Sequence, residues 1–228
     1  MTRTSDVDAE LRAIPVAGWP VYLDAHSGLP GPRANLTLVD AVARVADEAA
    51  IDELERDGGE YSTLCVAAAL GRRADDPAIE VRARALAADE RWRVREGVAR
   101  GLQLLGDVIP DALASIVRRW ADDADPLVQR AAVAAICEPR LLRAPESAAL
   151  ALDVCRRCTE HLAALPRTER SRNDVRSLRQ ALGYGWSVAV AADPVPGLIA
   201  FQALSTADPD IAWIVKENLR KKRLSALV

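Results

Sequence analysis

Aromatic residues are scarce in this sequence. Phe, Trp and Tyr make up 4% of the 228 residues, and there is a single Phe. Sheet proteins such as β-sandwiches are rich in Tyr, Thr and Phe, so the composition argues against them. Half of the residues are hydrophobic, which excludes a disordered chain, and Ala, Leu and Val favour helices packed through small side chains. The composition therefore predicts an all-α fold.

Long apolar runs are also missing. No stretch approaches the ~20 apolar residues that a membrane-spanning helix needs. The first residues, MTRTSDVD, contain no apolar core of a signal peptide. We therefore expect a cytoplasmic protein with no membrane partner.

Cysteines are few, and their positions do not suggest a disulfide framework. A reducing cytosol would keep Cys65, Cys137, Cys155 and Cys158 as thiols. Cys155, Cys158 and His161 have a spacing that invites comparison with a zinc site. No second ligand pair exists, however, and both cysteines belong to an apolar stripe at helical spacing. The stripe comprises Ala148, Ala151, Cys155, Cys158, Leu162 and Leu165. We predict buried packing thiols and no metal.

Signatures of common catalytic sites are absent as well. His26 lies in a Pro-rich segment without an evident nucleophile partner, so nothing supports a Ser-His or Cys-His mechanism. The chain has no Gly-rich phosphate loop. We expect no cofactor.

Charge is unevenly distributed along the chain. Residues 1–90 hold 9 Lys and Arg against 17 Asp and Glu, a net −8, whereas residues 91–228 hold 21 against 16, a net +5. The later part could therefore face an anion. Its two dense basic runs, residues 167–172 and 220–223, suit either phosphate binding or solvated helix ends.

The N-terminal segment is rich in Pro and Gly. Residues 15–32 should be irregular for this reason. Trp19, Tyr22 and Leu23 are unusual in a free tail, so we expect residues 1–34 to be docked on the first helices of a single domain that covers residues 1–228.

Helical periodicity begins at Asn35, and no alternating strand pattern of useful length appears. Asn35 is the expected N-cap of a first helix that ends at Asp57-Gly58-Gly59. Further helices are expected near residues 61–70, 77–87, 92–105, 109–120, 125–138, 147–165, 172–191, 195–204 and 210–222.

A short motif recurs along these helices. It consists of Asp, four residues, Val and a long polar residue, and it begins at Asp76, Asp89, Asp123 and Asp210. The second and third copies are 34 residues apart, which suits one helical hairpin. We expect the Val to face the core, while the Asp caps its helix and accepts from an Arg of a neighbouring hairpin. Arg82 and Arg95 then belong to a structural ladder.

This motif resembles the second helices of the HEAT-like repeat family, most clearly over residues 61–137 and 208–224. The resemblance implies a right-handed α-solenoid of stacked antiparallel helical hairpins. It also implies that a concave surface lined by the second helices receives a protein or nucleic-acid partner. We expect a monomer.

Two tryptophans follow a motif Asp by three residues, and each precedes a cation by three. These pairs are Trp92 with Arg95, and Trp213 with Lys216. Positions i and i+3 share a helix face, so each pair could present a ring beside a positive charge to a ligand. Alternatively, each ring seals the end of the stack.

The other candidate tryptophans have different settings. Trp120 extends an apolar stripe and should lie in the core. Trp186 lies between glycines in Gly183-Tyr184-Gly185-Trp186, where the helix could shape a pocket or pack tightly against a neighbour.

One enzymatic alternative follows from the family resemblance. Residues 120–142 look like the pattern of HEAT-like bacterial alkylpurine DNA glycosylases, with Gln129 where the first of two arginines would stand. The resemblance implies that Trp120 and Arg130 hold a damaged base and that Asp123 is the catalytic carboxylate. The leading hypothesis is a non-enzymatic binding module, and the glycosylase is the alternative.

Overall fold

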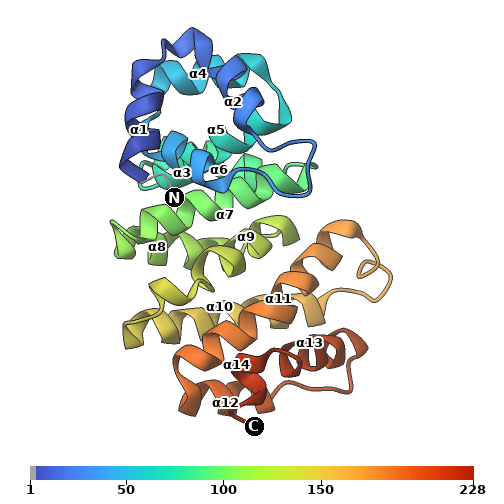
Figure 1. Ribbon diagram of the computed structural model, residues 1–228. Coiled ribbons are helices and arrows are strands. Elements are labelled where there is room, and N and C mark those ends of the chain that lie inside the picture. Colours follow the sequence, from blue (N-terminus) through green and yellow to red (C-terminus); the bar gives the residue numbers. More distant parts are fainter. Residues whose placement is uncertain (1–3) are drawn as a thin grey trace. The chain divides into compact units, whose positions relative to one another are not determined.

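The computed structural model describes residues 4–228, and every regular element in that range is a helix (Figure 1). The all-α prediction is therefore confirmed. The chain divides into two compact units, with the boundary between Val108 and Ile109. The predicted single domain and the handedness of the solenoid stay predictions. None of the described helices combines the length and apolarity that a membrane crossing requires.

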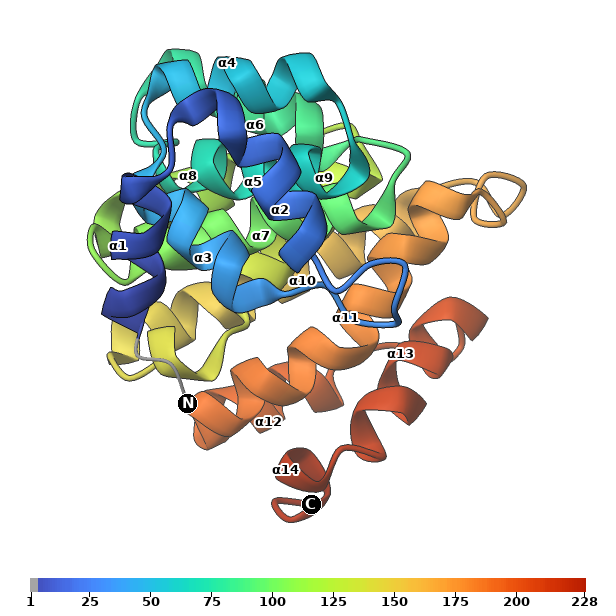
Figure 2. The ribbon, with the colours of Figure 1, turned by 45° about the horizontal axis from the view of Figure 1, so that its top comes forward.

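The first unit is built around one central helix. Its elements are α1 (Thr4–Ala13), the 3₁₀ helix η1 (Val16–Gly18), α2 (Trp19–His26), α3 (Leu36–Val45), α4 (Glu48–Asp57), α5 (Glu60–Arg72), α6 (Pro77–Ala87) and α7 (Trp92–Gly106). Helix α5 packs against α2, α3, α4, α6 and α7 (Figure 2). Almost all of its residues from Tyr61 to Gly71 are buried, as expected of a helix enclosed by neighbours.

Helices α5 and α7 approach each other closely because glycines face the contact. A Cβ atom on Gly97 would lie 2.5 Å from the carbonyl oxygen of Leu64, and one on Gly101 would overlap the carbonyl of Ala68. Neither contact is sterically allowed, so only glycine permits this separation between the two backbones.

The structure corrects the expectation that residues 15–32 are irregular. They contain η1 and α2, and Pro20 lies in the first turn of α2, where no helical N–H is needed. Within the described part of this segment, Trp19 and Leu23 are buried; the predicted docking of residues 1–34 as a whole stays a prediction, and residues 1–3 lie outside the described residues. The Trp19 Nε1 also donates to the carbonyl of Ile14 at 3.1 Å.

The first predicted helix is in fact two. Asn35 caps α3 as predicted, since its Oδ1 accepts from the Leu38 N–H at 3.2 Å. The helix ends at Val45, and Asp47 caps α4 by accepting from Ala50 N–H at 2.9 Å. Gly58, at φ 68°, ends α4 as expected. The apolar face continues across the break, which is why periodicity alone does not reveal it.

The second unit is also built around a central helix. It comprises α8 (Pro110–Ala121), α9 (Pro126–Ile136), the 3₁₀ helix η2 (Pro139–Leu141), α10 (Pro145–Ala164), α11 (Asn173–Ala192), α12 (Pro194–Gln202), α13 (Pro209–Leu219) and α14 (Lys222–Ser225). Helix α11 packs against α9, α10, α12, α13 and α14. Most of these helices, and α6 in the first unit, begin with a proline that follows a non-helical residue.

A buried asparagine connects α13 to α11. Asn218 is fully buried, and its Nδ2 donates to the carbonyls of Leu182 and Ile214 at 2.9 and 2.8 Å. Its Oδ1 accepts from the Ser187 N–H at 2.8 Å. The amide is therefore satisfied on both sides, as a buried polar group must be.

The cysteines are packing residues, as predicted. Cys155 and Cys158 are fully buried, and burial raises the pKa of the Cys158 thiol. The Cys137 Sγ lies 3.6 Å from that of Cys155. Within residues 4–228, no group of three or more His, Cys, Asp or Glu side chains is arranged to hold a metal ion.

The repeated motif behaves as expected in part. Asp76 caps α6, and Val94 and Val128 are buried. Arg82 bridges back to Glu48 and Glu55 of α4 at 2.6 and 2.9 Å, so it joins two helices as expected, but its partners are glutamates outside the motif. The expectation for Val81 is wrong, because 70% of its surface is exposed. Helix α6 buries Ala83 instead. Val81 is two residues before Ala83, so it lies about 200° around the helix from the buried face.

Candidate interaction surface

Trp92 lies in the first turn of α7, and 52% of its surface is exposed. The Arg93 guanidinium lies over the ring, with its Cζ 4.7 Å from the ring centroid. Arg93 Nη1 also donates to Glu60 Oε1 at 3.1 Å. The start of α5 therefore holds the cation that covers the ring. A structural plug would be buried, so the exposure of Trp92 favours a contact role.

The predicted pairing of Trp92 with Arg95 is wrong. Arg95 Nη1 donates to the carbonyls of Asp89 and Glu90 at 2.6 and 2.9 Å, in the loop before α7. Helical side chains lean toward the N-terminus of their helix, which brings Arg95 back over this loop. Arg95 thus fixes the approach of the chain to α7 and does not present a charge beside the ring.

A groove of about 430 Å³ lies in the same unit. Its lining comes from α2 and from the turn between α4 and α5, and α2 lies beside both helices (Figure 2). The lining residues are Pro20, Val21, Asp24, Ala25, Asp57, Gly59, Glu60, Tyr61 and Ser62. Glu60 belongs both to this lining and to the Arg93 pair, so the groove adjoins the residues that hold Trp92.

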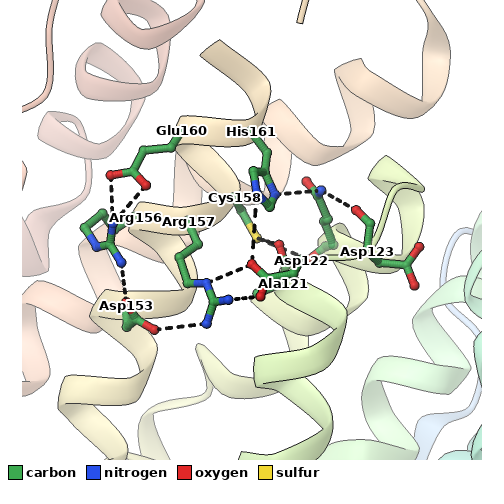
Figure 3. Close-up of polar contacts among 10 residues, drawn as sticks. Ala121, Asp122, Asp123, Asp153, Arg156, Arg157, Cys158, Glu160 and His161 are labelled. Atoms are coloured by element: carbon green, nitrogen blue, oxygen red, sulfur yellow. Dashed lines mark hydrogen bonds and ion pairs between the residues drawn. The ribbon is translucent and has the colours of Figure 1, made fainter. Parts of the chain in front are cut away.

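Asp123 lies in the loop between α8 and α9. Its carboxylate Oδ1 accepts from the Asp125 N–H at 2.9 Å, ahead of α9, and it points away from His161 (Figure 3). Trp120, which should hold a base beside it, is buried with 2% of its surface exposed. The core prediction for Trp120 is confirmed, and its ligand-contact role is wrong because a buried ring cannot stack on a base. Arg130 lies half-buried on α9.

A Cys, a His and an Asp do meet near Asp123, but they do not form a nucleophilic triad. The Cys158 thiol is buried and lies 3.8 Å from the Ala121 carbonyl, not on His161. The Gln129 Nε2 donates to the Asp123 carbonyl at 2.6 Å and to His161 Nδ1 at 3.1 Å (Figure 3). A raised thiol pKa and an occupied imidazole nitrogen both oppose thiolate chemistry.

The remaining bonds of this cluster are structural. Arg157 Nε donates to Asp122 Oδ1 at 2.8 Å, and Arg157 also pairs with Asp153 on its own helix (Figure 3). The Gln129 amide N–H faces His161 Nδ1, and the other ring nitrogen, Nε2, lies 4.0 Å from Asp122 Oδ1. These contacts join α10 to the end of α8.

Trp213 is packed differently from Trp92. Its ring lies against Gly183, where an added Cβ would be 2.8 Å from Cζ3. Arg179 lies over the ring at 4.8 Å and pairs with Asp210. The predicted pairing with Lys216 is wrong, because Lys216 is exposed one turn along and the stacked cation comes from α11. Trp213 therefore joins α13 to α11.

Trp186 is not available to contact a partner either. It is fully buried, and its Nε1 donates to Thr159 Oγ1 at 3.0 Å. The tight-packing alternative is correct for this residue, since a Cβ on Gly185 would lie 2.7 Å from the Val133 side chain. Among the predicted contacts, Trp92 alone combines a large exposed apolar surface with a fixed cation in the described part of the chain.

Comparison with known proteins agrees with the motif. Residues 48–137, which run from α4 into the residue after α9, match the family model described as HEAT repeats. No curated protein and no solved structure matches the chain.

Proposed function

We propose that this chain, whose residues 48–137 match the family model of HEAT repeats, is a non-enzymatic module that binds a partner protein through the surface around Trp92. The observation that carries the proposal is the half-exposed ring of Trp92 at the start of α7. Exposed aromatic anchors contribute a large share of the free energy of binding at protein interfaces.

The anchor is arranged before any partner arrives. Glu60 holds Arg93 against the ring, so neither side chain loses much rotamer freedom when a partner covers them. Preorganisation of this kind reduces the entropic cost of association. Trp and Arg are also the side chains most enriched among strongly contributing interface residues.

Charge favours a protein partner over a nucleic acid. Residues 1–108, which include Trp92, hold 13 Lys and Arg against 19 Asp and Glu, a net −6. Binding to a phosphate backbone requires a basic surface that releases counterions. The glycosylase alternative has no support from the geometry, because Trp120 is buried and the Asp123 carboxylate accepts from a backbone N–H.

The test compares Trp92→Ala with Val81→Ala, because Val81 is an apolar residue of the same unit that is 70% exposed, more than the 52% of Trp92. Partners captured from an extract of the source cells by the wild-type protein are identified by mass spectrometry and titrated as purified proteins. Trp92→Ala should weaken binding by about 1 kcal/mol or more, about fivefold in Kd, and Val81→Ala should not.

The thermal midpoint separates a binding role from a structural one. A half-exposed Trp92 contributes little packing, so Trp92→Ala should leave the midpoint nearly unchanged. Removal of a buried Trp costs roughly 3–5 kcal/mol, so a large fall in the midpoint would reject the binding role. Salt-dependent binding of duplex DNA that Trp92→Ala abolishes would replace the protein partner with a nucleic acid.

A further inference from the structure

The groove beside α2 combines an apolar wall with negatively charged side chains. Pro20, Val21 and Ala25 supply apolar surface, and Val21 is 76% exposed. Asp24 and Asp57 supply carboxylates. The volume, about 430 Å³, lies within the range of about 300–1,000 Å³ typical of ligand pockets.

Its two aspartates lie where helices disfavour them. Asp24 is in the last turn of α2, and Asp57 is the last residue of α4. The C-terminus of a helix carries partial negative charge, so a carboxylate there is repelled. Within residues 4–228, Arg56 pairs with Glu53, and His26 Nδ1 bonds the Tyr22 carbonyl at 2.8 Å. The Asp57 Oδ2 accepts from the Gly59 N–H at 3.1 Å, which is a neutral donor. A cationic ligand would offset the repulsion between each carboxylate and its helix end.

We propose that this groove binds a lysine- or arginine-rich peptide segment of the partner protein; the proposal rests on the function assigned above to the surface around Trp92. Lys and Arg have an apolar stem and a charged head, which match a wall of Pro20, Val21 and Ala25 that ends at carboxylates. The net charge of −6 over residues 1–108 attracts the same ligand.

The arrangement of the acids favours a peptide over a metal ion. The groove acids are not among any group within residues 4–228 that could hold a metal. Carboxylates that do not converge on one point suit several cationic side chains along one segment. Glu60 then connects the groove to Arg93 and Trp92, so a single partner can cover both features.

The probe is a fluorescein-labelled peptide of the sequence Lys-Arg-Leu-Lys-Arg-Leu-Lys, titrated with the full chain by fluorescence anisotropy. Its acidic counterpart has Glu in place of each Lys and Arg. The basic peptide should bind saturably and more weakly as salt rises from about 50 to about 200 mM. The acidic peptide should not bind.

Two double variants separate a groove from general electrostatics. Asp24→Asn with Asp57→Asn should weaken binding about fivefold or more, because two ionic contacts are lost. The control, Asp111→Asn with Glu146→Gln, removes two exposed acids of the second unit and should leave binding unchanged. Val21→Ser should weaken binding without lowering the thermal midpoint, since Val21 is exposed.

Several results would overturn the proposal. These are absence of binding by the basic peptide, or an equal loss in both double variants. Self-association in sedimentation velocity that only the Asp24/Asp57 variant abolishes would make a second copy the occupant, in place of a separate partner. None of these outcomes affects the partner titration with Trp92→Ala, so failure of the groove and failure of the proposed function are distinguishable.

Discussion

Arg93 covers the Trp92 ring because both residues lie in the first turn of α7, where Glu60 of α5 attracts the guanidinium. Sequence spacing favours Arg95, which shares a helix face with Trp92. Helical side chains lean toward the N-terminus of their helix, however, and Arg95 reaches back to the Asp89 carbonyl in the loop before α7. Trp92 could therefore be predicted as a candidate contact from the sequence. The cation that covers its ring could not, because Glu60 of another helix positions Arg93.

Asn218 provides a test at the residue scale. Asn218→Leu removes three hydrogen bonds and leaves buried backbone groups of α11 without that partner. We expect a loss of roughly 1–3 kcal/mol in the free energy of unfolding, measured by urea denaturation. Asn173→Leu, at the exposed start of α11, is the control and should change it little. Equal stability of the two variants would show that the bridge contributes nothing.

At the scale of elements, helical periodicity and end signals located most helices of residues 60–219 within a few residues. Asp125 with Pro126 marked the start of α9 as predicted. Helix α2 was missed because Pro20 is compatible with a first turn as well as with a loop. The groove could not be predicted, since it joins residues 20–25 to residues 57–62 through tertiary packing alone.

Gly101 tests the contact between α5 and α7. In a helix interior, Gly→Ala normally stabilises by roughly 0.5–1 kcal/mol. Gly101→Ala should instead destabilise by about 1–3 kcal/mol, because the added methyl group meets the α5 backbone. A lowered thermal midpoint would show that the close contact between α5 and α7 requires glycine at this position. A raised midpoint would mean that the two helices can move apart without loss of stability.

At the scale of the whole molecule, charge divides as the chain does. Residues 1–108 carry a net −6 and residues 109–228 a net +3. The sequence showed this asymmetry but not the boundary, because the residues around Val108 have no linker composition. The predicted single domain requires that both units unfold together.

The cysteines can test whether the two units unfold together, because each unit contains at least one. Cys65 lies in the first unit, and Cys137, Cys155 and Cys158 lie in the second. All four thiols are buried, so a thiol reagent should reach them slowly in the native state. Burial also raises the pKa of Cys65 and Cys158, which lowers the fraction of reactive thiolate. In rising urea they should become reactive at one midpoint. Separate midpoints for Cys65 and the other three would mean two domains.

The prolines that begin α6, α8, α9, α10, α12 and α13 limit how far these helices can extend. Proline has no N–H to donate, and it disfavours the helical conformation in the residue before it. Such a helix cannot lengthen into the preceding loop, so it can gain turns only at its C-terminal end.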